Sequence, residues 1–362
     1  MKLFYLIAGT YRAAGMERAL ANKANWLASR GYDVTIVTTD QRDREPAFPL
    51  DASIKSVDLG IDYELTNGRS FLVKAAQYPL KQLRHRIRLG CLLKAEKPDV
   101  TVCMFNNDAA FVPRIKDGSR KVLEVHFSRF KRLQYGRGGL WALADKWRSR
   151  NDLKVASRFD RFVVLTQEDR GYWGELPNIR VIPNARTFEP GDLPQMAREK
   201  VVLAAGRYSH QKHFDALIEA WCRIDTADWT LRIAGEGDSL GELPENVITG
   251  PAEDMKSEFA RASIFALSSR YEGLPMVLLE AQAAGLPIVS FSCKCGPRDV
   301  VTDGVDGFLV PEDDIASLAA RLRQLMDDES LRLRMSEAAL VASERFDEQK
   351  IMLEWESLFA EL

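Results

Sequence analysis

Residues 268–287 read SSRYEGLPMVLLEAQAAGLP. We expect a helix to open near residues 273–275, because proline is tolerated in the first turn of a helix, where its missing N–H costs little. A helix that opens there presents unpaired backbone N–H groups, which favour an anion. Apolar runs flank this helix at residues 264–267 and 287–291. Strand, helix and strand in this order favour a βαβ unit with parallel strands.

Two glutamates accompany this helix. Glu272 precedes it, and Glu280 lies inside it in an otherwise apolar run. Eight residues correspond to about two helical turns, so we expect both carboxylates on roughly the same side. A carboxylate beside an apolar surface needs a partner, and sugar or ribose hydroxyls are suitable ones. The alternative interpretation is a glutamate at a helix start and a second, solvated glutamate.

The alternation of apolar strands and helices runs along the chain in two series, starting at residues 3 and 201, with prolines and glycines clustered between 183 and 194. It predicts an α/β fold of two Rossmann-like, doubly wound domains that face each other across a cleft. We expect an N-terminal domain at 1–185, a C-terminal domain at 186–345, and a last helix at 346–362 that packs back on the N-terminal domain. Expected strands are 3–8, 34–38, 100–104, 121–125, 161–165, 201–205, 229–234, 264–267 and 287–291; expected helices are 16–30, 80–95, 215–222, 274–284, 315–326 and 348–362.

Two loops after expected strands carry features of a phosphate site. Gly15 stands where the first strand turns into a helix, so backbone N–H groups there can approach an anion closely, although Gly15 is equally compatible with a simple turn. In the second series, Gly206 and Arg207 follow a strand, and Lys212 comes five residues later. An arginine fork and a lysine point charge suit a diphosphate. Two solvated surface cations are the alternative.

Over nearly its whole length, the chain resembles a known family, the retaining GT-B glycosyltransferases of family 4 (group 1). The resemblance rests on the order of several short motifs, each weak alone. They are the loop 14–18, the Ile182-Pro183-Asn184 hinge, the Gly206-Arg207…Lys212 pair, the turn 234–237, the Glu272-x₇-Glu280 spacing and the turn 303–310. Ala14 stands where the family commonly has the first glycine of a Gly-Gly pair.

The resemblance implies roles for these residues. Arg207 and Lys212 would bind the donor diphosphate and stabilise charge on the leaving nucleotide, and Glu272 would contact the donor sugar. Glu280 would bind ribose hydroxyls. Gly15 and Gly206 would approach the phosphates. The donor-binding segment of Gly273, Leu274, Pro275 and Met276 would hold phosphate and sugar through its backbone N–H groups. Preorganised cations and helix dipoles stabilise such a departing charge.

Two further residues are assigned through the same resemblance. His126, which follows the expected strand 121–125, matches the family's histidine near the donor sugar. A structural histidine is the alternative. Glu17 is a candidate on the acceptor side.

We expect neither a cofactor nor a metal. The sequence contains no Asp-x-Asp motif, and the pairs Cys293/Cys295 and His210/His213 are too far apart in sequence to favour zinc over free thiols. A nicotinamide cofactor would need a sharper Gly-x-Gly-x-x-Gly loop than the one around Gly15. An NAD-linked oxidoreductase and a non-catalytic nucleotide-sugar-binding protein remain the alternative functions.

Charge is divided unevenly along the chain. Residues 1–180 hold 32 Lys+Arg and 20 Asp+Glu, a net of +12, and the remainder carries −14. Basic residues interleaved with aromatics suit an anionic membrane surface, with a solvated basic face as the alternative; the acidic C-terminal half disfavours nucleic acid. The basic stretches hold Lys81, Arg84, His85, Arg86 and Arg88, then Arg129, Lys131, Arg132, Arg137, Lys146, Arg148 and Arg150, with Trp141 and Trp147 between them.

The family resemblance and the composition together give an expected activity and location. Residues 295–300 resemble a stretch of bacterial transferases that use UDP-galactose, UDP-N-acetylgalactosamine or UDP-glucose. We expect a UDP-hexose donor and a saccharide acceptor, carried on a polyprenyl diphosphate, in capsule, O-antigen or exopolysaccharide synthesis. Five cysteines, an odd number, favour a reducing compartment. We therefore expect a cytoplasmic protein, with peripheral contact to the inner membrane face.

Overall fold

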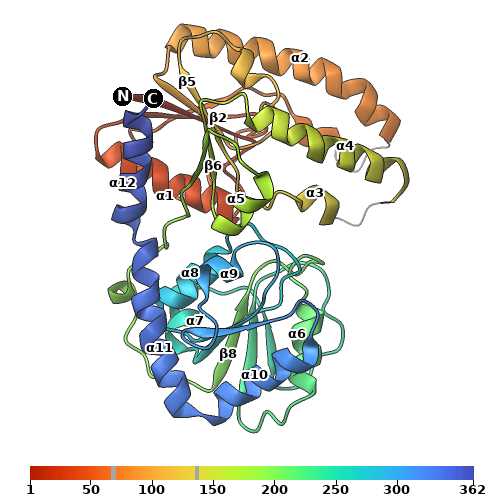
Figure 1. The fold of residues 1–362 in the computed structure, drawn as a ribbon, viewed down its shortest axis with the longest axis vertical. Helices are drawn as coiled ribbons and strands as arrows, with labels where there is room; N and C mark the ends of the chain where they lie inside the picture. Colours follow the sequence, from red (N-terminus) through yellow and green to blue (C-terminus); the bar gives the residue numbers. More distant parts are fainter. Residues whose placement is uncertain (67–70, 135–137) are drawn as a thin grey trace. The chain divides into compact units, whose positions relative to one another are not determined.

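The computed structural model describes residues 1–66, 71–134 and 138–362. The chain divides into two compact units, which we call unit 1 and unit 2. Unit 1 comprises residues 1–165, 170–182 and 352–362, and unit 2 comprises residues 166–169 and 183–351. Each unit is built on one parallel β-sheet with helices on both faces (Figure 1). The two parallel-sheet α/β units are those of the GT-B fold expected from the sequence; the boundaries of the domains stay predictions.

Unit 1 contains a seven-stranded sheet in the order β3-β2-β1-β4-β5-β6-β7. Every neighbouring pair is parallel, so each connection must cross over the sheet. The central strands are buried on both faces, which is why they read as unbroken apolar runs. The strands are β1 Lys2–Ile7, β2 Asp33–Thr38, β3 Lys55–Asp58, β4 Val100–Cys103, β5 Arg120–Glu124, β6 Arg161–Val164 and β7 Ile179–Val181.

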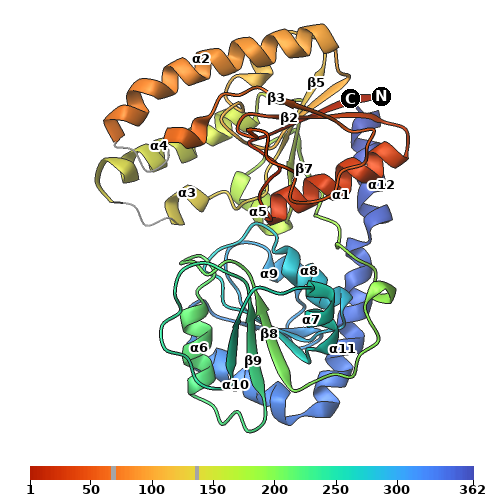
Figure 2. The same ribbon diagram turned by 180° about the vertical axis from the view of Figure 1, so that it is seen from behind.

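Helices cover both faces of the unit 1 sheet. On one face, Leu89 and Leu93 of α2 and Val155 of α4 join the core formed with the strands. On the other face lie α1 and α12, as both views show (Figures 1 and 2). The α-helices before residue 200 are α1 Gly15–Ser29, α2 Phe71–Glu96, α3 Lys131–Gln134, α4 Gly139–Ala156 and α5 Gln167–Trp173; short 3₁₀ turns lie at Tyr63–Thr66 and Val112–Arg114.

Unit 2 repeats the architecture with a six-stranded parallel sheet in the order β10-β9-β8-β11-β12-β13. Its core joins Trp221 of α6 and Leu322 of α10 to the strands on one face. The α7 and α8 helices lie on the other face (Figure 2). The strands are β8 Val201–Ala205, β9 Thr230–Ala234, β10 Val247–Gly250, β11 Ile264–Leu267, β12 Ile288–Phe291 and β13 Gly307–Val310.

The remaining helices follow in chain order, and the last one ends in unit 1. They are α6 Phe214–Cys222, α7 Met255–Arg261, α8 Met276–Ala283, α9 Pro297–Val300, α10 Ile315–Asp327, α11 Glu329–Ser343 and α12 Glu348–Ala360, with 3₁₀ turns at Pro190–Asp192 and Glu344–Phe346. The residues of α12 from Met352 onward belong to unit 1. Trp355 and Phe359 are buried there, which anchors the end of the chain.

Candidate functional site

The sequence-predicted site residues fall into both units. Gly15, Glu17 and His126 belong to unit 1, and all the others belong to unit 2. Each of these two groups of site residues therefore lies around a sheet of its own.

In unit 2, the turn after β8 is shaped so that a lysine side chain can lie across it. Gly206 has a φ of +147°, a conformation that favours glycine. A Cβ atom at Gly206 would lie 2.8 Å from Cε of Lys212, well inside normal contact distance. The turn at Gly235 packs equally closely, since a Cβ there would lie 2.0 Å from the carbonyl oxygen of Gly206. Gly206 therefore lets the Lys212 side chain lie directly on the backbone, and Gly235 lets the next turn pack against Gly206.

The ammonium group of Lys212 pairs with the carboxylate of Glu272. The distance from Lys212 Nζ to Glu272 Oε1 is 2.7 Å, and the two side chains are 17% and 9% exposed. Gln211 Nε2 donates to the carbonyl of Tyr271 at 3.0 Å and lies 3.5 Å from Glu272 Oε2. Two of the predicted residues, 60 positions apart in sequence, are thus brought into direct contact at the carboxyl end of the sheet.

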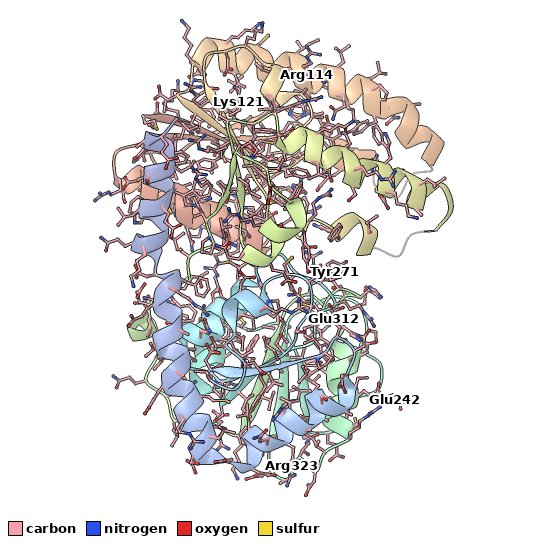
Figure 3. All side chains as sticks on the ribbon, in the orientation of Figure 1. Arg114, Lys121, Glu242, Tyr271, Glu312 and Arg323 are labelled. Carbon is pink, nitrogen blue, oxygen red and sulfur yellow. The ribbon has the colours of Figure 1, made fainter. Side chains whose placement is uncertain are left out.

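Backbone hydrogen bonds hold the two segments that carry this pair. The N–H of Arg270 donates to the carbonyl of Gln211 at 2.9 Å, and the hydroxyl of Ser268 donates to the carbonyl of Lys212 at 2.9 Å. The N–H of Glu272 donates to the carbonyl of Lys294 at 2.9 Å. Tyr271, which precedes Glu272, marks this loop in Figure 3. The ion pair is therefore held by segments that follow β8, β11 and β12.

The α8 helix opens beside this pair. It begins at Met276, with Pro275 as its N-cap residue and no side-chain cap, so its first N–H groups are available to an anion. Gly296, at φ +101°, approaches the same segment, and a Cβ there would lie 2.5 Å from Cδ of Pro275. The segment that leads into α8 therefore follows Glu272, which pairs with Lys212, and packs closely against Gly296.

Glu280 has a partner that the sequence did not indicate. Thr187 Oγ1 donates to Glu280 Oε1 at 2.7 Å. Glu272 lies before α8 and not in it, so the expectation that both glutamates share a helix side does not apply. The helical period relates side chains only within a helix, and each carboxylate has its own setting: Glu272 against Lys212, and Glu280 against Thr187.

Arg207 differs from Lys212 in its surroundings. Its side chain is exposed, and within the described ranges it forms no ion pair with a carboxylate. A guanidinium that is not engaged with an acidic side chain can bind an incoming anion without first breaking a contact.

A cluster around His213 adjoins Lys212 and was not expected from the sequence. His213 lies in the left-handed region, at φ 52°, as the N-cap of α6. Its Nδ1 lies 2.7 Å from Asp215 Oδ1 and its Nε2 lies 2.9 Å from Asp313 Oδ1. Arg270 Nη2 lies 3.0 Å from His213 Nδ1. The cluster fixes the end of the loop that carries Lys212.

In unit 1, the predicted glycine loop leads into α1. Gly15 is the first residue of α1, and its N-cap residue Ala14 forms no side-chain cap. Glu17 lies in the first turn and is 8% exposed. An acidic side chain in the first turn is stabilised by the helix dipole. The structure therefore places Gly15, which is exposed, at the start of this helix.

His126 follows β5 and belongs to a buried charged cluster. Its Nε2 lies 2.9 Å from Glu124 Oε1, an ion-pair distance, although the atoms are not aligned for a hydrogen bond. Lys23 Nζ of α1 lies 2.5 Å from the same Glu124 oxygen. Burial would raise the pKa of Glu124, but the charges of Lys23 and His126 outweigh it and hold that pKa at about 2. Glu124 is thus a buried carboxylate that stays ionised.

The sequence-predicted basic stretches are only partly basic surface. His85 is 1% exposed and faces the hydroxyl of Tyr63, and burial lowers its pKa to about 4, so it is neutral. Arg129 is also buried and donates to Ser149 Oγ at 2.9 Å. Assigning these two residues to a basic face was wrong, because a sequence run of charges does not report burial. Arg137 and the side chains of Arg132 and Trp141 lie outside the described part.

No side-chain cluster suited to a metal ion stands out in residues 1–66, 71–134 and 138–362: no group of three or more His, Cys, Asp or Glu is placed to hold one. Cys293 and Cys295 are buried free thiols. The same described residues contain no helix that combines the length and apolar character needed to cross a bilayer.

Two family models match the chain, one in each series of strands. The model described as Glycosyltransferase Family 4 matches residues 13–186, and the model described as Glycosyl transferases group 1 matches residues 199–328. The chain belongs to this glycosyltransferase family. The first match contains Gly15, Glu17 and His126, and the second contains every predicted site residue of unit 2. The family expected from the short motifs is therefore confirmed.

Curated relatives of this glycosyltransferase match it from end to end. The amylovoran biosynthesis glycosyltransferase AmsD of Erwinia amylovora is 26% identical, with 99% of each chain covered. A second relative, also 26% identical, is an α-1,4-N-acetyl-D-galactosaminyltransferase of Campylobacter jejuni. Its name gives a GalNAc-containing diNAcBac-PP-undecaprenol as the acceptor, and the match includes 100% of the present chain and 99% of the relative. Among solved structures, HepE of Anabaena in complex with UDP-glucose superimposes with a TM-score of 0.74 at 17% identity, with 100% of both chains covered. That likeness shows the fold.

Proposed function

We propose that this chain transfers a hexose or N-acetylhexosamine, of the galactose, N-acetylgalactosamine or glucose type, from a UDP-sugar to a saccharide acceptor, with retention of anomeric configuration and without a metal. The observation that carries the proposal is the Lys212–Glu272 pair, at 2.7 Å, on the Gly206 turn. A preorganised cation beside a helix N-terminus is what a departing nucleoside diphosphate requires.

The residues of unit 2 divide the chemistry between them. As the bond from sugar to phosphate breaks, negative charge grows on the leaving diphosphate. Lys212 and Arg207 neutralise that charge, and the first N–H groups of α8 add the field of the helix dipole. When Lys212 turns to a phosphate oxygen, it releases Glu272, whose carboxylate can then accept hydrogen bonds from hydroxyls of the donor sugar. The pair therefore serves as a switch between a closed ion pair and a loaded donor site.

Glu280 suits the ribose of the nucleotide. It accepts one hydroxyl already, that of Thr187 at 2.7 Å, and the two oxygens of a carboxylate can together accept several hydrogen bonds, including those of vicinal ribose hydroxyls. UDP as the nucleotide is supported by the resemblance of residues 295–300 to transferases that use UDP-hexoses. The printed name of the Campylobacter relative, with its undecaprenol-linked acceptor, supports a polyprenyl-diphosphate-linked saccharide as the acceptor here.

The acceptor's lipid gives a reason for contact with an anionic membrane, and we include peripheral binding at the cytoplasmic face in the proposal. On α2, Leu80, Leu83 and Ile87 are exposed at helical spacing, with the exposed Arg84 and Arg86 between them. On α4, Trp147 is 68% exposed among the exposed Lys146, Arg148 and Arg150. Exposed apolar side chains interleaved with arginine and lysine favour a bilayer of anionic lipid.

Flotation with vesicles tests the membrane part. The Leu80→Ser/Leu83→Ser variant should lose binding to phosphatidylglycerol vesicles, and neither it nor the native protein should bind phosphatidylcholine vesicles. The matched control is Leu333→Ser/Val341→Ser on α11, where the side chains are 59% and 70% exposed, as Leu83 and Leu80 are 57% and 70% exposed. Equal binding of both variants, or equal binding to both lipids, would contradict the contact surface.

Calorimetry with UDP, GDP, ADP and NAD⁺ in EDTA tests the nucleotide site. We expect UDP to bind and NAD⁺ to produce no heat. Lys212→Met should weaken UDP binding, while Lys200→Met, which removes a solvent-exposed lysine paired with Asp228 at 2.7 Å, should not. Binding of NAD⁺ alone would favour an oxidoreductase. UDP binding without transfer from any UDP-sugar would leave a non-catalytic binding protein.

A further inference from the structure

We propose that Glu124 is the positioning residue for His126, and that Lys23 and Trp355 hold Glu124 in place. The inference rests on the proposed sugar transfer and on the place near the donor sugar that the family resemblance implies for His126. It adds three residues, from α1, β5 and α12, to a site that the sequence placed only at Gly15, Glu17 and His126.

Glu124 is positioned to orient the histidine. It is the last residue of β5, and His126 follows two residues later in the loop, where its ring reaches back to the Glu124 carboxylate. Glu124 is 1% exposed and His126 Nε2 lies 2.9 Å from its Oε1. A buried carboxylate at this distance favours the tautomer that carries a proton on Nε2, although the two atoms are not aligned for a hydrogen bond in this structure.

Lys23 fixes the carboxylate in turn. Its ammonium lies 2.5 Å from Glu124 Oε1, with the lysine side chain only 6% exposed. The same ammonium lies 3.6 Å from the centroid of the Trp355 ring and 5.9 Å from that of Tyr5. Ring faces replace part of the hydration that a buried ammonium loses. Lys23 and His126 therefore both lie against the same oxygen of Glu124, Oε1.

The cluster also sets the position of the predicted glycine loop. Lys23 belongs to α1, the helix that starts at Gly15 and carries Glu17 in its first turn. Its pairing with Glu124 connects α1 to the end of β5. This one buried ion pair therefore helps to set the positions of Gly15 and Glu17 on α1 and of His126 after β5. Such a pair contributes little net stability compared with apolar side chains of the same volume, and a positioning role explains why charges occupy the place.

A second buried pair on the same strand provides the control. Lys121 of β5, labelled in Figure 3, pairs with Asp117 at 2.6 Å, with side chains 6% and 0% exposed. This pair is close to Lys23–Glu124 in length and burial, and its ammonium donates to Asp117 and Ser119, whereas His126 lies against Glu124. Asp117→Asn therefore shows what the loss of a buried ion pair on β5 does to the protein when Glu124 and His126 are left unchanged.

The first measurement is the ring ¹⁵N NMR spectrum of protein labelled at its four histidines, with the His126 signals assigned from their loss in His126→Ala. Glu124→Gln should move the His126 ring signals and leave those of His85, His210 and His213 in place, whereas Asp117→Asn should move none. Unchanged His126 signals in Glu124→Gln would overturn the proposal. If Glu124→Gln folds poorly, Lys23→Met/Glu124→Gln replaces the pair by a neutral one of the same volume and is measured in the same way.

The second measurement is a double-mutant cycle on transfer from a UDP-sugar. Glu124→Gln should lower kcat by about ten- to a hundredfold, the cost of misplacing a reacting group by up to 1 Å, with the donor KM and UDP affinity unchanged. In the His126→Ala background it should cost nothing more. Additive losses would overturn the proposal. Failure of the native protein to bind UDP would refute the proposed function, and the NMR measurement would still decide the position of His126.

Discussion

Replacement of Gly206 by alanine tests whether the placement of Lys212 matters for catalysis. The new Cβ would lie 2.8 Å from Cε, 3.2 Å from Cδ and 3.4 Å from Cγ of Lys212. Carbon atoms pack at about 3.5–4.0 Å, so the lysine side chain must move by about 1 Å. A displacement of this size at a reacting group costs about a hundredfold in rate, or about 2.7 kcal/mol of transition-state stabilisation.

The same substitution also strains the backbone, and a control separates the two effects. Alanine at a φ of +147° costs about 1–3 kcal/mol of folding free energy. Gly250, also in unit 2, has a φ of +127°, and a Cβ there meets nothing within 4 Å. Gly250→Ala therefore carries the strain without the collision.

The assay pairs thermal unfolding with kcat/KM for transfer from a UDP-sugar. Both variants should unfold at a lower temperature than the native protein. Only Gly206→Ala should lose about a hundredfold in kcat/KM. Equal kcat/KM values for the two variants would refute the assignment of Lys212 to the leaving diphosphate.

Lys212→Ala should lower kcat by about a hundred- to a thousandfold, since it removes a preorganised cation, while the unfolding temperature stays close to native; an unchanged kcat would remove its role. Glu280→Ala should weaken UDP binding by about tenfold with little change in kcat, because a hydrogen bond to a charged group contributes about 1.5–3 kcal/mol, and calorimetry checks this; Thr187→Val, which removes only its partner hydroxyl, should weaken binding less. Acid should destabilise unit 1 through His85, whose pKa is about 4 in the folded protein and about 6.5 in the unfolded chain. The contribution of neutral His85 to folding stability is therefore fully present above pH 6.5. It is lost as the pH falls from 6.5 to about 4, by up to about 3 kcal/mol. Unfolding midpoints at pH 7 and pH 5 should show this loss in the native protein and not in His85→Gln.

The sequence predicted the parts of the fold that depend on local pattern. Strands such as β8 and β11 are at the predicted residues, because fully buried parallel strands read as apolar runs. The short strands β3 and β7 were not predicted, since β3 is mostly exposed and β7 has three residues. The α2 helix begins well before the expected residue 80 and continues through Pro79, where sequence rules favour a break.

In the site, too, the sequence predicted which residues take part, but not the contacts between residues that lie far apart in the chain. Motif order assigned Lys212 and Glu272 to one donor site, but it did not predict their ion pair, because that contact joins loops after two different strands of the sheet. The Thr187 contact of Glu280 could not be predicted, since a lone threonine after the hinge carries no pattern. Lys23 occupies a buried position of α1 beside apolar residues, and a lysine at such a position needs a buried acidic partner, which is the signal that could have led to Glu124.

Transfer itself is the most direct test of the central claim. The native protein is incubated in EDTA with a polyprenyl-diphosphate-linked saccharide and, in turn, UDP-galactose, UDP-N-acetylgalactosamine and UDP-glucose, and the product is examined by mass spectrometry and by NMR of its new anomeric centre. We predict that one of these donors extends the acceptor by a single sugar in the donor's own α configuration, and that Lys212→Ala slows the formation of this product by about a hundred- to a thousandfold. An inverted linkage would contradict the retaining mechanism, and the absence of product from every UDP-sugar, with UDP bound, would contradict the assignment of this site to sugar transfer.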